Sequence, residues 1–160
     1  MRNDLIVAQG QELSPLSLTK ARAVQVWIAE AKDLETATDL MSGAGAMSAI
    51  VKRFKKRAGV EFEAIFEWAR ADLEARRKVG EMIRQMQDAG ELRKERERLV
   101  TGMDQYNLNG NDSSLCQRLA SIPQEVWDNE FEYLRDKELV PTIAHFLALW
   151  RTLNPPVRGE

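Results

Sequence analysis

The chain has 160 residues, 44% hydrophobic and 30% charged, which excludes a disordered or collagen-like class of protein. Its formal net charge of -2 excludes coating of nucleic acid through bulk positive charge, so polyanion binding requires a local patch. One cysteine, Cys116, and one histidine, His145, are too few for an internal disulfide or a conventional zinc site. The apolar runs are too short for a signal segment or membrane span, so we expect a cytoplasmic protein.

The N-terminal third predicts an arm followed by two helices. Residues 1–17 mix Gly, Ser and Pro without periodicity, which is typical of a flexible arm. From about Leu18, one helical face carries apolar residues spaced i, i+3, i+4 and i+7: Val24, Trp27, Ile28 and Ala31. A second apolar stripe then predicts a helix that stops near Gly59, through Ala37, Leu40, Met41, Ala44, Met47, Val51 and Phe54.

A single long helix is predicted from Val60 to roughly Arg98, because this segment lacks proline and is dominated by helix-forming residues. Its stripe runs through Phe62, Ile65, Phe66, Ala69, Leu73, Val79, Ile83, Met86 and Gly90. We expect these residues to pack in the core. The alternative is a partner groove on a projecting second half, which makes this helix the candidate dimer interface.

Two further helices are expected near the C-terminus, each opened by a proline, Pro123 and Pro141. Their apolar faces are Val126, Trp127, Phe131 and Leu134, and then Ile143, Phe146, Leu147 and Trp150. Sustained strand alternation is missing from the sequence, so the predicted fold class is all-α. We expect an N-terminal three-helix unit with a long third helix over 18–98, a small helical unit over 99–153 and a tail over 154–160. Whether the two units share one core is left open.

The stretch GMDQYNLNGNDSSLCQRLASIP, residues 102–123, is polar and nearly uncharged. Thr101 is placed to cap a short helix, and Asn107 suits a chain reversal because asparagine tolerates the left-handed conformation. A second helix follows with a buried edge of Leu115, Leu119 and Ile122. This arrangement predicts a helix-turn-helix. Its candidate base-reading residues are Asn109, Asn111, Ser114, Gln117 and Arg118.

The same spacing fits a helical hairpin whose polar face only meets water, and spacing alone favours that interpretation because it is common in helical proteins. Charge points the same way. Residues 112–138 contain seven acidic and three basic side chains, and an acidic surround repels phosphate unless the reading edge points away from it.

Basic residues gather in two other places. The candidate phosphate contacts are Lys52, Arg53, Lys55, Lys56 and Arg57 at the predicted end of the second helix, and Arg76, Arg77 and Lys78 on the third. A solvated face explains them equally well, and one or two cations at a helix C-terminus also complement its dipole.

Four short motifs together resemble a group of phage and mobile-element accessory proteins. The motifs are AEAKDL (29–34), KRFKKRAG (52–59), EARRKVGE (74–81) and LASIP (119–123). Members of that group combine an N-terminal helical region with a ParB-like helix-turn-helix that ends in a segment similar to LASIP. The resemblance implies a DNA-associated accessory protein of a bacterial or phage-infected cell, a transcriptional or partition-type regulator without enzymatic activity.

This chain departs from the group in two respects. The Gly, Lys and Arg-rich linker often found before the helix-turn-helix is missing, and Leu115 and Cys116 stand where a basic or aromatic residue is common. Both departures bear on sequence-specific DNA binding.

Catalytic, metal and cofactor residues are not predicted. His145 has no Ser, Cys or carboxylate at a suggestive spacing, and Cys116 fits a buried small hydrophobe. We therefore expect a protein that is not an enzyme, with DNA and a second copy of the chain as partners and no membrane. The alternatives are a protein-interaction module without DNA binding and a purely structural scaffold. In an interaction module the basic cluster would be a solvated face, and a scaffold would form oligomers without another ligand.

Overall fold

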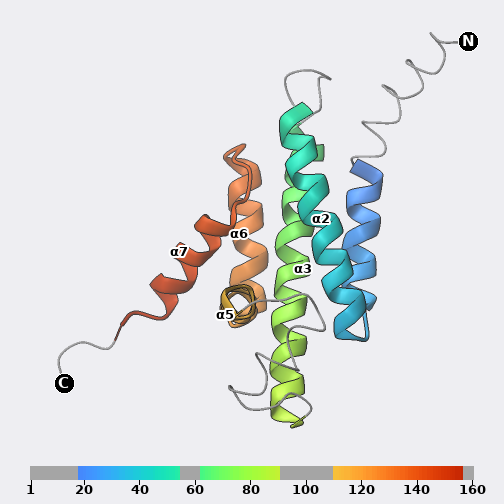
Figure 1. Cartoon of the computed structure of the whole chain (residues 1–160). Coiled ribbons are helices and arrows are strands. Elements are labelled where there is room, and N and C mark those ends of the chain that lie inside the picture. Colours follow the sequence, from blue (N-terminus) through green and yellow to red (C-terminus); the bar gives the residue numbers. More distant parts are fainter. Residues whose placement is uncertain (1–17, 55–61, 91–109, 157–160) are drawn as a thin grey trace, which may run out of the picture.

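The computed structural model describes residues 18–54, 62–90 and 110–156 (Figure 1). The helices in these ranges are a first helix over residues 18–30, α2 (Leu34–Phe54), α3 (Phe62–Asp88), α5 (Gly110–Ala120), α6 (Gln124–Asp136) and α7 (Ile143–Leu153). The described residues contain no strand. The prediction of an all-α fold with a long third helix is confirmed.

None of the described helices combines the length and apolar character needed to cross a membrane.

Short polar side chains explain where two helices begin. The Asp33 carboxylate accepts a hydrogen bond of 2.7 Å from the Thr36 backbone N–H, and this bond lowers the pKa of Asp33. It satisfies one of the free N–H groups in the first turn of α2. At the start of α7, the Thr142 hydroxyl accepts from the His145 N–H at 3.1 Å. The capping residue of α7 is therefore Thr142, and Pro141, the predicted opening residue, lies just before it.

Helix α3 is the centre of the molecule. It runs between the first helix and α2 on one side and α5, α6 and α7 on the other (Figure 1). Each of the hydrophobic clusters uses α3: Ile83 packs with Leu34 and Cys116, and Phe66 packs with Phe131 and other aromatic residues of the C-terminal helices. The helices of both predicted units therefore pack against α3, and residues of α3 belong to each hydrophobic cluster.

A buried carboxylate ties three helices together. Glu67 of α3 is only 5% exposed, and it accepts a 2.7 Å hydrogen bond from Gln25 of the first helix and another bond from Arg135 of α6. Arg135 also lies 3.7 Å from Glu63. Because a buried charge requires compensation, these partners specify how the first helix and α6 dock on α3.

Two predictions about the helices are wrong. Trp27 was expected in the core but is 49% exposed, because the buried face of the first helix follows Ala21, Gln25 and Ile28, where Gln25 reaches Glu67. The third helix was expected to reach Arg98, but α3 ends at Asp88 and Gly90 has a positive φ of 73°. A glycine in the left-handed conformation is a common helix stop. Residues 91–109 lie outside the described ranges.

Candidate nucleic-acid interface

Helix α5, the predicted reading helix, sits directly on the backbone of α3. Its residues Cys116 and Leu119 are fully buried, and Ile122 is buried just after the helix. A Cβ atom on Gly80 of α3 would lie only 2.0 Å from the carbonyl oxygen of Cys116. The predicted buried edge of α5 is confirmed for Leu119 and Ile122, while Leu115 is partly buried.

A three-residue connection, Ser121 to Pro123, joins α5 to α6. Arg77 Nη2 donates a 2.8 Å hydrogen bond to the backbone carbonyl of Ile122 within this connection. Pro123 occupies the N-cap of α6, as expected of a proline that opens a helix. This hydrogen bond fixes the connection to α3. It therefore also fixes the C-terminal end of α5, which leads into the connection.

The predicted base-reading residues have different environments. Ser114 and Arg118 are exposed on the outer side of α5. Gln117 is partly buried and its Nε2 donates a 3.0 Å hydrogen bond to Ser113, which is itself buried. Asn111 belongs to α5, but the structure does not describe its side chain. Asn109 lies outside the described residues. The helix predicted to begin after Thr101 also lies outside the described residues.

Arg118 contacts an aromatic residue that the sequence did not associate with it. Its Cζ lies over the ring of Trp150 of α7, 5.2 Å from the centroid. Trp150 Nε1 donates a 2.7 Å hydrogen bond to Ser121 Oγ, and Ser121 Oγ donates a 2.6 Å bond to the Arg118 carbonyl. Trp150 was predicted on the apolar face of the last helix. Its spacing of 32 residues from Arg118 carries no local signal.

Only some of the described candidate phosphate contacts have exposed side chains. Lys52 and Arg53 are exposed in the last turn of α2, whereas Lys55, Lys56 and Arg57 lie outside the described residues. Arg76 is paired with Asp72 at 3.1 Å, and Lys78 Nζ donates a 3.1 Å hydrogen bond to the carbonyl of Ala29. Of the described candidates, Lys52 and Arg53 are the ones whose side chains are exposed.

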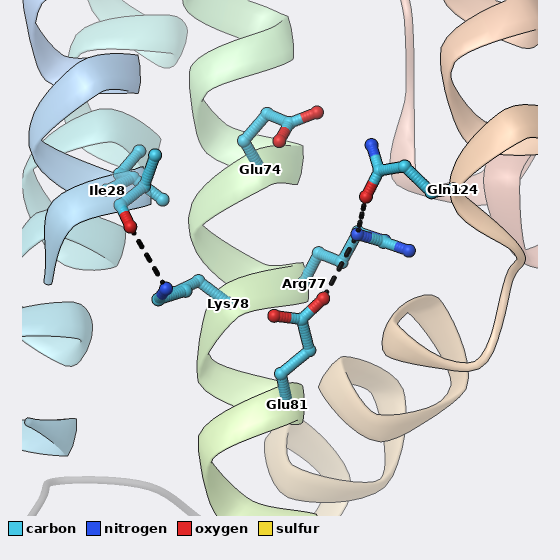
Figure 2. A pocket seen from close by; sticks show the side chains of 7 residues that line it. Ile28, Glu74, Arg77, Lys78, Glu81 and Gln124 are labelled. Atoms are coloured by element: carbon cyan, nitrogen blue, oxygen red, sulfur yellow. Dashed lines mark hydrogen bonds and ion pairs between the residues drawn. The ribbon is translucent and has the colours of Figure 1, made fainter. Parts of the chain in front are cut away.

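Arg77 requires a correction, because its position does not suit phosphate contact. The residue is 8% exposed, and its Nη1 donates to Glu81 at 3.0 Å and to Gln124 at 2.7 Å. Figure 2 shows its guanidinium between these two side chains. Arg77 therefore joins α3 to the start of α6, a role that its place in a run of basic residues did not reveal.

A cleft of about 270 Å³ lies beside Arg77, between the first helix, α3 and α6 (Figure 2). It is lined by Ile28, Ala29, Glu74, Arg77, Lys78, Glu81 and Gln124. Burial raises the pKa of Glu74, although a hydrogen bond from Trp127 and the nearby Arg70 oppose the shift. Because the lining charges are of both signs and partly paired with one another, the cleft has no single electrostatic preference for a ligand.

Several acidic residues of α6 are paired within the protein. Asp128 lies 3.8 Å from Arg70, and Glu130 lies 2.6 Å from His145 Nε2. The Arg70 cation thus offsets part of the predicted excess of negative charge around the reading helix, at Asp128.

The expected burial of Cys116 is confirmed, since the residue is 0% exposed and its sulfur lies 3.9 Å from Met41 Sδ. Burial raises the pKa of its thiol to about 12. A thiol in this state is a packing group rather than a nucleophile.

No known protein family, curated protein or solved structure matches the chain. The features that point to a function are the geometry of α5 and the short motifs of the sequence.

The exposed basic residues and the outer face of α5 lie at different heights along α3. Val51, near the end of α2, packs with Ala64 and Ile65, whereas α5 packs at Gly80. Fifteen residues of helix separate Ile65 from Gly80, which corresponds to roughly 22 Å. The two groups therefore do not form a single patch.

Proposed function

We propose that this chain is a non-enzymatic, DNA-associated protein that uses α5 to contact DNA. The observation that carries the proposal is the division of α5 into two faces. Cys116 and Leu119 anchor one face, and Ser114 and Arg118 project from the other. A helix held rigidly by its inner face, with short polar and guanidinium groups outside, is what major-groove recognition requires.

In this proposal α5 lies in the major groove. Arg118 donates to acceptors on a base edge or a phosphate, and Ser114 donates or accepts at its neighbour. Lys52 and Arg53 add phosphate contacts at the other end of the molecule. The motif resemblance supports a role as a transcriptional or partition-type regulator of a phage or mobile element.

Dimerisation belongs to the same proposal, because one helix reads few base pairs and two half-sites raise specificity. Most of α3 is unsuitable as the interface, since its buried residues extend from Ala64 to Ile83. Arg84, Gln85 and Asp88 near its end are exposed. We therefore propose the exposed end of α3 as the contact. Sedimentation equilibrium of the full chain tests this, and a monomer mass at all concentrations would refute it.

The experiment that tests DNA association is fluorescence anisotropy with labelled duplexes, one of mixed sequence and one from the region upstream of the gene, at low and moderate salt. Arg118→Ala is expected to weaken binding about 5- to 150-fold, the range for a lost arginine–base contact. Arg22→Ala is the matched control, because Arg22 is exposed on the first helix and its loss removes the same charge. Equal affinities of the two variants would refute α5 as the contact helix.

A protein-interaction module is the second candidate function, and one observation favours it. Val26 and Trp27 are adjacent on the first helix and are 54% and 49% exposed. Exposed large apolar side chains, and tryptophan in particular, are common in protein interfaces. This function predicts that Trp27→Glu lowers association with a protein partner or a second copy. It also predicts that Lys52→Glu combined with Arg53→Glu changes nothing, whereas DNA binding predicts a large loss and a smaller salt slope.

A further inference from the structure

We infer that Trp150 is a positioning residue that holds Arg118 ready for an acceptor with two oxygen or nitrogen atoms side by side, on a guanine edge or a phosphate of DNA. The inference rests on the proposed function and names the chemistry that α5 would recognise.

Four arginines lie over aromatic rings in the described residues. Arg70 lies over Phe131 at 4.6 Å, Arg77 over Trp127 at 5.1 Å, Arg135 over Phe66 at 4.6 Å and Arg118 over Trp150 at 5.2 Å. The first three arginines also have carboxylate partners: Asp128 and Glu74 for Arg70, Glu81 for Arg77, and Glu67 and Glu63 for Arg135. Those three are neutralised and join elements of the fold.

Arg118 differs from them. Within the described part of the chain its guanidinium has no carboxylate partner and no hydrogen-bond acceptor, and the residue is exposed. A guanidinium lying over an indole is attracted by the ring, while its N–H groups point along its own plane. The contact with the indole therefore restricts the side chain, while its N–H donors make no hydrogen bond within the described residues.

The ring beneath Arg118 is itself fixed. Trp150 donates to Ser121 Oγ at 2.7 Å, and the Ser121 hydroxyl donates to the backbone carbonyl of Arg118 at 2.6 Å. One hydroxyl can accept and donate in this way at the same time. Helix α7, which carries Trp150, is anchored by the fully buried Phe146. The indole thus has a defined position relative to the backbone from which Arg118 extends.

The ligand that suits this arrangement follows from guanidinium geometry. Two parallel N–H donors match the O6 and N7 atoms of guanine, or two oxygens of one phosphate. Because Trp150 already restricts the side chain, less rotamer freedom remains to be lost when the acceptor binds. Trp150 would raise affinity without contacting the acceptor.

The test compares Trp150→Leu and Ser121→Ala with Tyr133→Phe as the control, since Tyr133 is an exposed aromatic residue on α6 outside the proposed contact surfaces. Ring-current shifts of the Arg118 side-chain protons, measured by NMR without DNA, report the stack itself. We expect upfield shifts in the wild type and the control and their loss in Trp150→Leu. Ser121→Ala leaves the Trp150 ring and the Arg118 side chain in place. It therefore remains informative if a substitution of Trp150 impairs folding.

DNA affinity is then measured with duplexes that contain guanine or 7-deazaguanine, which lacks the N7 acceptor. Trp150→Leu should weaken binding several-fold, Ser121→Ala less, and Tyr133→Phe not at all. A loss of affinity with 7-deazaguanine identifies the base edge. Equal affinity for both duplexes, with a salt slope lowered by about one in Arg118→Ala, identifies a phosphate.

The outcomes separate this inference from the proposed function. A wild-type protein that binds no duplex overturns both, even if the NMR shifts are present. Binding that is lost in Arg118→Ala but unchanged in Trp150→Leu and Ser121→Ala overturns only the role of Trp150.

Discussion

Gly80 of α3 lies against the backbone of Cys116 in α5 so closely that a Cβ atom would stand 2.0 Å from the Cys116 carbonyl oxygen and 2.4 Å from its carbon. Real Cβ contacts do not reach such distances, and the neighbour is main chain rather than the mobile end of a side chain. The position of α5 on α3 therefore depends on the absence of a side chain at residue 80. The angle at which α5 presents Arg118 depends on it as well.

Gly80→Ala should consequently displace α5 and destabilise the fold by about 1–3 kcal/mol or more, the usual cost of overpacking. Gly43→Ala is the matched control, because Gly43 also lies within a helix but nothing lies within 4 Å of its added Cβ. In Gly43→Ala the higher helix propensity of alanine should increase the free energy of unfolding by roughly 0.5–1 kcal/mol. Urea unfolding followed by circular dichroism measures both. Equal effects of the two substitutions would show that α5 does not pack on α3 as described.

The end of α6 provides a second, stabilising prediction. Glu138 has a φ of 56°, and the backbone N–H groups of Glu138 and Leu139 donate to Arg135 and Leu134 in the pattern that closes a helix. A non-glycine residue pays for this left-handed conformation, so Glu138→Gly should stabilise by about 1 kcal/mol. Lys137→Gly is the control: Lys137 has a φ of -85°, and glycine there should not stabilise. Thermal unfolding would contradict the prediction if Glu138→Gly lowered the melting temperature.

The apolar residues of α3 show how far the sequence predicts this fold. Of the expected stripe, Ile65, Phe66, Ala69, Leu73, Val79 and Ile83 are buried, Phe62 and Met86 are partly buried, and Gly90 lies beyond the end of the helix and is exposed. A second face of α3 is also buried through Ala64, Trp68, Ala71 and Ala75, and this second stripe was missed. Its spacing of i, i+4, i+7 and i+11 was present in the sequence, and two apolar stripes on one helix predict a central helix.

The candidate site was less predictable. Helix α5 and its buried edge followed from periodicity, because local spacing determines which side chains share a helical face. Pairs such as Arg118 with Trp150 and Gln25 with Glu67 form between helices far apart in sequence, so they depend on docking angles that spacing does not encode. Arg77 was misjudged for the same reason, since its burial arises only when α6 begins beside α3.

Glu74 gives a prediction about pH. Burial raises its pKa above the usual 4.5, so the folded state retains its proton at pH values where the unfolded state has lost it. The contribution of Glu74 to the free energy of unfolding is then complete below the pKa of the unfolded state. It is lost as pH rises through the pKa of the folded state. Glu74→Gln keeps an oxygen acceptor for Trp127 but no longer titrates. Its stability relative to the wild type should therefore increase with pH from 4.5 upward. Urea unfolding of both proteins across this range measures the difference, and parallel curves would contradict the prediction.

The last prediction concerns Cys116, whose thiol pKa is raised by burial from 9.0 to about 12. At any pH below 9 the native thiolate fraction should be about a thousandfold smaller than in the unfolded chain, because each pKa unit is a factor of ten. Reaction of the native protein with Ellman's reagent should be slower by at least that factor, since the sulfur is also inaccessible. Above pH 9 the unfolded thiol ionises first, so this group also lowers stability as pH rises. The same reaction in concentrated urea is the control. A rapid reaction without urea would mean that α5 separates readily from α3, which would also remove the rigid support proposed for Arg118.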